Sequence, residues 1–402
     1  GGTSGVEFLL NGNPLSDNYT YTGSLTNNAG GTISGSAGPA LLVETGVTIT
    51  GDVVNAGTFT NGTTNGAVSL IQGQISGNYN FGAAENTTAS THIVTGDILG
   101  TTTLSTTQSD TIVLSGTARL SDITGDAGQT HTIVVRDLTA AENNGSAVAV
   151  GTSVIGNDDA GDNNSTISNI SLIDLDQGTL TIDIDVTSFQ ADVIDIAAGT
   201  VLDNNTFSGL DVNTVNLAGG LSDETTFTGD TTINVVSGAQ SNATISASGA
   251  NDVFNVDLTT GTTFSLGGDL RFFEQVNINS GTLDTSIGRI EFAETVNLAQ
   301  GATLDVSSAN AYDATTTNVD GTWIVSNTSR VDGTVNLNST GVISGIFRMD
   351  GQAGTQILNL NGGRITDTFD IDGNVTNTNR SIAFVPSGVG TALGYDDSAS
   401  RW

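Results

Sequence analysis

The sequence lacks several residue types, and each absence removes a class of protein from consideration. It contains no cysteine, so disulfide bridges and thiol chemistry are excluded. It also contains no lysine: nine arginines stand against 42 acidic residues, and the formal net charge is -33. Such an acidic surface repels phosphate backbones and anionic lipids, and no apolar run reaches the ~18 residues of a membrane-spanning helix. We therefore expect neither a nucleic-acid partner nor membrane insertion.

The abundant residues are those of strands and tight turns. The chain has 52 glycines but only three prolines, and it is rich in Thr, Ser, Asn and Asp. Threonine and valine favour pleated, half-buried strands, whereas Gly, Asn and Asp favour turns. Hydrophobic residues make up 36% of the chain and recur periodically, as they do not in disordered segments. This composition predicts an all-β protein.

One short sequence motif recurs through most of the chain. It consists of an apolar residue, then Asn or Asp, then an aliphatic residue, as in Val215-Asn216-Leu217. Its successive copies lie 18 to 23 residues apart, which indicates stacked structural repeats. The central polar residues of these copies are Asp174, Asp195, Asn216, Asn234, Asn255, Asn277, Asn297, Asn318, Asn336 and Asn359. A weaker version of the same period can be followed from residue 24.

Each repeat is long enough for three short strands joined by three corners. That pattern predicts a single-stranded, right-handed parallel β-helix, or β-solenoid, with about 20 residues per rung and roughly 18 rungs. Because side chains alternate along a strand, Val215 and Leu217 should enter the core while Asn216 faces outward.

Three segments are expected. Residues 1–23 form an N-terminal capping or docking segment, and residues 24–385 form the solenoid, with loop insertions around 140–169 where the repeat weakens. Residues 386–402 form a non-repetitive C-terminal tail. Loops on a rigid scaffold often carry binding sites, so the insertions are candidates for function.

The recurring asparagines predict a structural ladder, in which amide side chains of successive rungs hydrogen-bond to one another. Its members are Asn216, Asn234, Asn255, Asn277, Asn297, Asn318, Asn336 and Asn359. Asp174 and Asp195 share that register, where two like charges one rung apart are unfavourable unless a cation lies between them.

Calcium is the one metal that the sequence suggests. Asp158, Asp159 and Asp162 lie in an acidic loop and offer the hard oxygen ligands that calcium prefers, although EF-hand spacing is missing. The stretch Ser248–Val256 resembles a single copy of the calcium-binding RTX nonapeptide, but it does not repeat in tandem. Apart from calcium, no cofactor is expected.

Catalytic signatures are sparse. His92 and His131, the only histidines, lie about two rungs apart, too far to share a metal, and are interpreted as surface residues. Each of three arginines lies near an acidic residue, as outward charge pairs do. These pairs are Arg271 with Glu274, Arg289 with Glu291, and Arg364 with Asp367. The aromatic residues Phe254, Phe273, Phe292, Trp323 and Phe347 are expected to fill the core.

Rungs such as Thr295–Leu304 and Thr48–Phe59 resemble those of bacterial autotransporter passenger domains and related surface adhesins. The resemblance lies in the style of the repeat over about residues 24 to 385 and in no single motif. It implies an exported protein with a right-handed β-helix, and an adhesive, proteolytic or structural role at the bacterial surface.

We interpret the chain as a secreted, extracellular and non-enzymatic protein of the bacterial cell surface. It would be a rigid acidic solenoid serving as an adhesin-like passenger or as a fibre, filament or surface-layer subunit, in contact with a host surface or a polysaccharide. Two alternatives remain. A polysaccharide-active lyase or glycosidase predicts a groove with exposed aromatics and carboxylates beside an arginine, and a calcium-dependent surface layer predicts loss of stability on chelation.

Head-to-tail self-association is expected because the ends of a solenoid are open strand edges. A head-to-tail contact that does not close generates filaments. Both ends carry apolar or aromatic residues suited to such a contact, namely Phe8, Leu9, Leu10, Tyr395 and Trp402.

Overall fold

The computed structural model consists of strands and turns and divides into two compact units, Gly1–Val212 and Asn213–Trp402, each described by itself below. The residues described are 6–8, 19–35, 38–60, 67–84, 89–156, 165–183, 186–205, 208–285, 287–307, 312–326, 331, 333–349, 355–367, 369–370 and 381–386. Over these ranges there is no helix. The described chain accordingly offers no helical segment of the length and hydrophobicity needed to cross a membrane.

The N-terminal unit is built from short strands, most of three to seven residues. They are β1 (Val6–Phe8), β2 (Tyr19–Tyr21), β3 (Leu25–Asn27), β4 (Thr32–Ser34), β5 (Leu41–Val43), β6 (Val47–Ile49), β7 (Val53–Asn55), β8 (Thr58–Thr60), β9 (Ser69–Ile71), β10 (Gln74–Ile75), β11 (Tyr79–Asn80), β12 (Thr91–Val94), β13 (Asp97–Thr103), β14 (Thr111–Leu114), β15 (Arg119–Thr124), β16 (Thr132–Val135), β17 (Thr152–Ile155), β18 (Ser165–Leu175), β19 (Thr179–Ile182), β20 (Val186–Ile196) and β21 (Val201–Asp203). The boundary between the units falls inside β22 (Ser208–Leu217).

The C-terminal unit continues with the same kind of strand. Its members are β23 (Gly220–Ser222), β24 (Thr225–Phe227), β25 (Thr232–Val236), β26 (Gln240–Ser241), β27 (Ile245–Ala247), β28 (Val253–Asp257), β29 (Thr263–Ser265), β30 (Leu270–Arg271), β31 (Gln275–Ser280), β32 (Thr282–Asp284), β33 (Ile290–Leu298), β34 (Thr303–Asp305), β35 (Tyr312–Val319), β36 (Thr322–Val325), β37 (Thr334–Asn338), β38 (Val342–Gly345), β39 (Phe347–Arg348), β40 (Thr355–Asn361), β41 (Arg364–Ile365), β42 (Phe369–Asp370) and β43 (Ser381–Pro386).

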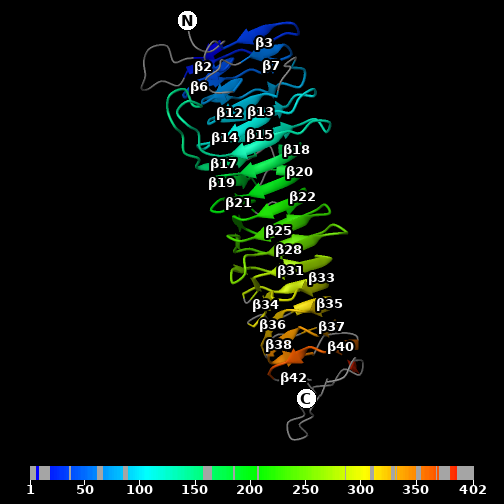
Figure 1. Ribbon diagram of the computed structural model, residues 1–402. Coiled ribbons are helices and arrows are strands. Elements are labelled where there is room, and N and C mark those ends of the chain that lie inside the picture. The colour runs from blue at the N-terminus through cyan, green and yellow to red at the C-terminus, as the bar shows by residue number, and fades with distance from the viewer. Residues whose placement is uncertain are drawn as a thin grey trace. The chain divides into compact units, whose positions relative to one another are not determined.

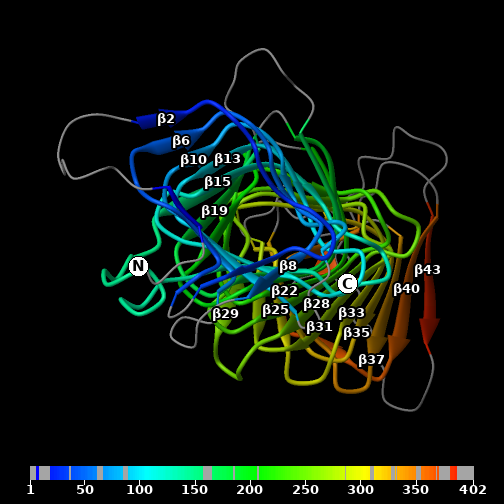
Figure 2. The same ribbon diagram turned by 90° about the horizontal axis from the view of Figure 1, so that it is seen from above.

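Every strand pairing named in this section is parallel, and it joins a strand to its counterpart one turn away. In the N-terminal unit β12 lies between β9 and β14. In the C-terminal unit β33 lies between β31 and β35 (Figure 1). Seen from above, β33, β35, β37 and β40 lie side by side along one face (Figure 2). The predicted all-β parallel solenoid is thus confirmed.

The core follows the alternation read from the sequence. Val215 and Leu217 are fully buried, and the intervening Asn216 is half-buried on the outer face. The same pattern recurs one turn later at Ile233 and Val235. Because no repeat can enclose its own apolar side chains, burial comes from stacking one turn on the next.

Two kinds of close approach require glycine at the corners. A Cβ atom on Gly288 would lie 1.6 Å from the carbonyl oxygen of Gly268, so the backbones of adjacent turns touch at this corner. Gly281 has a φ of +75°, and a Cβ there would lie 2.5 Å from the Cβ of Leu258. Glycine alone combines that backbone conformation with the absence of a side chain.

The asparagines of the repeat form a continuous hydrogen-bonded ladder in the C-terminal unit. Each Nδ2 donates to the Oδ1 of the asparagine one turn earlier, over distances of 2.7 to 3.0 Å. Its members are Asn216, Asn234, Asn255, Asn277, Asn297, Asn318, Asn336 and Asn359, the set predicted from the sequence. Since the amide group has both a donor and an acceptor, it can extend such a chain through every turn.

A second, shorter ladder was not predicted. Asn361 donates to Asn338, and Asn338 donates to Asp320, each pair one turn apart. All three residues lie two positions after a member of the main ladder, so the same period contained the signal. In the N-terminal unit, Asn27 and Asn55 form a buried pair of the same kind, with an Nδ2 to Oδ1 distance of 2.8 Å.

Candidate functional site

Residues 136–150, here called the strap, leave the strand register between β16 and β17 of the N-terminal unit. The strap folds back on itself, because Leu138 and Val148 form an antiparallel bridge in which each N–H donates to the other's carbonyl, at 2.8 and 3.1 Å. The expected insertion around 140–169 therefore begins as an ordered, self-paired segment. The acidic part of that insertion, with Asp158, Asp159 and Asp162, lies outside the described residues.

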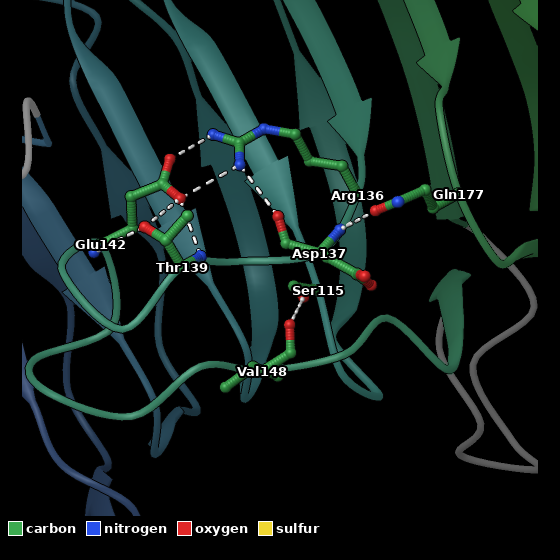
Figure 3. Close-up of polar contacts among 7 residues, drawn as sticks. All are labelled: Ser115, Arg136, Asp137, Thr139, Glu142, Val148 and Gln177. Carbon is green, nitrogen blue, oxygen red and sulfur yellow. Dashed lines mark hydrogen bonds and ion pairs between the residues drawn. The ribbon is translucent and has the colours of Figure 1, made fainter.

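Charge-assisted hydrogen bonds fix the base of the strap (Figure 3). Both terminal nitrogens of Arg136 donate to the carboxylate of Glu142, at 2.6 and 3.3 Å. The N–H and hydroxyl of Thr139 donate to the same carboxylate at 2.9 and 2.8 Å, and Gln177 accepts from the N–H of Asp137 at 2.8 Å. Hydrogen bonding to the Arg136 guanidinium lowers the pKa of Glu142 to about 2.

The strap covers an apolar column on the outer face of the solenoid. Leu42, Leu70, Ile93 and Val113 come from four successive turns and form one buried cluster with Leu138, against which Val148 packs. Gln72 donates to the Oδ1 of Asn143 at 2.8 Å and holds the far part of the strap on the same face. The strap thus hides an outward stripe that would otherwise invite association.

A different outward feature lies in the C-terminal unit, where two phenylalanine rings stack in the solvent. Phe272 is 48% exposed and Phe292 is 57% exposed. Their ring centroids are 5.0 Å apart, and their planes differ by 6°. The expectation that Phe292 fills the core is therefore wrong, whereas Phe254, Phe273, Trp323 and Phe347 are buried as expected.

A bulge lies at one of these two rings. Between the register pairs Ile290 with Tyr312 and Ala293 with Ala314, β33 has two residues where β35 has one, and Phe292 is one of the two. Phe292 has a positive φ of 59°, and Phe272, one turn earlier, has a positive φ of 63°. A bulge re-aims a side chain, and positive φ is unfavourable for a bulky residue, so such positions are candidates for function.

Four charged side chains flank the rings and form a closed set of ion pairs. Arg271 pairs with Asp269 and, at 2.8 Å, with Glu291, while Arg289 pairs with Asp269 at 2.9 Å and with Glu291 at 2.6 Å. Arg271 and Glu291 are also register partners on β30 and β33. Positive and negative groups therefore alternate around the set, and their charges cancel.

The carboxylate of Asp269 is held in its ionised form, which does not suit acid catalysis. Burial raises the pKa of Asp269, but the hydrogen bonds and charges of Arg289 and Arg271 outweigh it and hold that pKa below its usual range. Glycoside cleavage requires a general acid whose pKa is raised. The set is suited instead to fixing two guanidinium groups in place beside the rings.

Both histidines lie in the core of the N-terminal unit, so the prediction that they are surface residues is wrong. His92 is 1% exposed and packs edge-on against the rings of Tyr79 and Phe81. Its Nδ1 lies 2.9 Å from the Tyr79 hydroxyl and 3.0 Å from the Ser69 hydroxyl. Its ring lies on the core side of β12, the side that the buried Val94 also faces, whereas Ile93 on the other side packs under the strap.

Burial controls the protonation of this polar cluster. Loss of solvent, followed by the charge of His131, lowers the pKa of His92 to about 3, and burial also lowers the pKa of His131. Burial raises the pKa of Asp110 to about 6, partly offset by the N–H of Ser105, which donates to it at 2.7 Å. His92 is therefore neutral at physiological pH, with two hydroxyl groups in hydrogen-bonding distance of its Nδ1.

The remaining predicted charge pairs have other surroundings. Glu274 accepts from the N–H of Asp252 at 2.5 Å instead of pairing with Arg271. Arg364 lines a surface hollow of about 360 Å³ together with Gln300 and Thr340. Of the residues assigned to end-to-end assembly, the side chain of Phe8 and all of Leu9, Leu10, Tyr395 and Trp402 lie outside the described part.

Two of the stretches that suggested a cation, the Asp174–Asp195 register and the RTX-like stretch, lie among the described residues. Asp174 and Asp195 are register partners, and burial, then Asp176 and Asp195, raise the pKa of Asp174. In the RTX-like stretch, Asp252 accepts from the N–H of Thr231 at 2.7 Å, which joins neighbouring turns directly. Within the described residues, no three His, Asp or Glu side chains are grouped so that they could hold a metal ion.

Comparison with protein-family models, with curated proteins and with solved structures finds no match to this chain. The resemblance to autotransporter passengers stays a prediction from the style of the repeat. What the protein does must be inferred from its own geometry, and the two outward features described above are the starting points.

Replacing Glu142 by Gln should loosen the strap, because it removes the charge that orders Arg136 and Thr139. Trypsin cleaves after arginine, and the chain has only nine basic residues, so the fragments are few. The rate at which the fragment ending at Arg136 appears therefore measures the opening of the strap. For a partly exposed ion pair we expect about a three- to tenfold faster cut there. Glu294→Gln, at an exposed site on the other unit, should leave the rate unchanged. An equal rate in Glu142→Gln would contradict the anchoring role.

The pKa of His92 predicts acid sensitivity. In the unfolded chain this histidine takes up a proton below about pH 6.5, whereas in the folded protein it does so only near pH 3. Its contribution to stability is therefore present above pH 6.5 and is lost as the pH falls toward 3. Asp110 acts in the opposite sense, because its raised pKa stabilises the fold at low pH, a contribution lost as the pH rises through about 6.

His92→Asn retains an acceptor near the position of Nδ1 but cannot titrate. Its melting temperature should fall less between about pH 7 and about pH 4 than that of the unmodified protein. Val113→Ala, a buried change in the same unit without a titrating group, should lower the melting temperature but keep the unmodified pH dependence. Identical pH dependence in all three proteins would show that His92 does not titrate as described.

Proposed function

We propose that this protein is a secreted, non-enzymatic structural protein of the bacterial cell surface. In this proposal it is a right-handed solenoid of roughly 18 rungs that serves as an adhesin-like passenger or as a subunit of a fibre, filament or surface layer. The observation that supports it best is the asparagine ladder from Asn216 to Asn359, which adds a hydrogen-bonded column of side chains to the strand pairing of the turns it spans. A continuous ladder of this kind stiffens a stack of short repeats.

The charge of the chain supports an extracellular setting. A net charge of -33 keeps copies apart at low ionic strength and allows closer approach where salt screens it. The absence of cysteine is compatible with export. In this setting the acidic surface maintains solubility, and specific contacts are left to places where the repeat is interrupted.

The polysaccharide-active alternative predicts exposed aromatic residues and carboxylates beside an arginine, and the stack of Phe272 and Phe292 beside two arginines is the place to test it. The lowered pKa of Asp269 argues against cleavage at that place, since its carboxylate stays ionised. Binding without catalysis is therefore the form of polysaccharide contact that agrees with the proposal.

The assembly part of the proposal predicts filaments. Purified protein in about 0.15 M salt, viewed by negative-stain electron microscopy, should form end-to-end filaments, because open solenoid edges pair with one another. Deleting residues 386–402 should shorten them or abolish them, and adding a calcium chelator to the full chain tests the surface-layer alternative. Single, separate particles at every concentration, unchanged by the deletion, would contradict end-to-end assembly.

A further inference from the structure

Six residues of the C-terminal unit form what is here called the Phe-Arg patch: Asp269, Arg271, Phe272, Arg289, Glu291 and Phe292. We propose that this patch is a docking surface for a second copy of the same chain, which pairs the copies side by side. This lateral contact is distinct from the end-to-end assembly proposed above, and neither contact requires the other.

The apolar part of the patch is costly to the isolated chain. Most described phenylalanines of this unit are buried, including Phe227, Phe254 and Phe264. Phe272 and Phe292 are instead turned into solvent at positive φ, although a bulky side chain is disfavoured there. A partner that covers the two rings would remove their exposed apolar surface from water.

The charges around the rings explain why that partner can be another copy of a very acidic protein. With a net charge of -33, two copies repel each other over most of their surfaces. At the patch, two guanidinium groups cancel two carboxylates, so close approach carries no local charge penalty. Arginine and aromatic residues are also those most enriched at the centres of protein interfaces.

The order of the charges favours self-pairing in particular. Positive and negative groups alternate around the closed set of Asp269, Arg271, Glu291 and Arg289. A copy related by a two-fold axis presents the same set in reverse order, so each guanidinium can lie opposite a carboxylate of the partner. A two-fold contact requires such a self-complementary surface.

A sugar chain would use the rings differently. Sugars stack on open aromatic faces, but Phe272 and Phe292 cover one face of each other, with centroids 5.0 Å apart. The carboxylates are likewise already held by Arg271 and Arg289. The patch therefore resembles a pre-ordered interface more than a sugar-binding platform.

The test begins with sedimentation equilibrium of the full chain. A small patch predicts a weak dimer, with a dissociation constant on the order of 10–100 µM. Raising the salt from about 0.05 to about 0.5 M should tighten it, because salt screens the long-range repulsion between copies more than it weakens contacts inside the patch. A protein that stays monomeric across these concentrations and salt conditions would overturn the proposal.

Substitutions locate the contact. The double variant Phe272→Asn, Phe292→Asn removes both rings while keeping residues that tolerate positive φ, so the fold should be retained and circular dichroism can verify it. Dimer affinity should fall at least tenfold. Tyr19→Thr, which removes an aromatic side chain that is 54% exposed in the other unit, should leave the affinity unchanged. Equal affinity in the double variant and the unmodified protein would also overturn the proposal.

Cross-linking separates lateral pairing from end-to-end contact. Because the chain has no cysteine, Glu294→Cys places a single reactive thiol at an exposed position two residues beyond Phe292. A short bis-maleimide should yield a covalent dimer of this variant but not of Thr60→Cys, an exposed position in the N-terminal unit. Dimers should persist when residues 386–402 are deleted.

If the protein forms no filaments in electron microscopy but still cross-links, that result contradicts end-to-end assembly and leaves the lateral contact standing. Cross-linking equal in both cysteine variants would contradict the patch.

Discussion

Every feature of this protein depends on parallel strands of successive turns lying in register. A turn of about 20 residues has too little apolar surface to form a core by itself, so its side chains are buried only by the turns on either side. Val215 and Leu217 reach full burial in this way, and Asn216 on the opposite side bonds to Asn234. A one-residue slip would turn the aliphatic residues outward and break the ladder at the same time.

The main elements of the fold could be predicted because this constraint leaves a periodic trace in the sequence. The spacing of Asn216 and its equivalents predicted both the parallel solenoid and the ladder, and Asp320, Asn338 and Asn361 carried the same signal at an offset of two residues. Alternation also placed Phe254 and Trp323 in the core. At these positions the alternation along the strand and the packing between turns place the side chain on the same side.

The errors occur where that agreement fails. Phe292 occupies a surplus position in a bulge, which the period alone does not reveal. His92 lies on the core side of its strand, where Ser69 and Tyr79 from neighbouring strands lie within hydrogen-bonding distance of its ring. Partners supplied by other strands leave no short-range pattern around a polar residue. Both errors concern positions that the repeat pattern does not describe. The two candidate sites, the strap and the Phe-Arg patch, also lie where the repeat is interrupted.

The in-register stacking of turns is tested most directly by disulfide formation, because the chain has no cysteine of its own. Asn277 and Asn297 are register partners on β31 and β33, where neighbouring strands lie about 4.8 Å apart, within the range of a disulfide. Mild oxidation of the Asn277→Cys, Asn297→Cys protein should give an internal disulfide in nearly every molecule, whereas Asn277→Cys, Leu298→Cys, with side chains on opposite faces, should give none. Equal yields from the two pairs, or bridging of the second pair alone, would contradict the solenoid register on which the ladder, the strap and the Phe-Arg patch all depend.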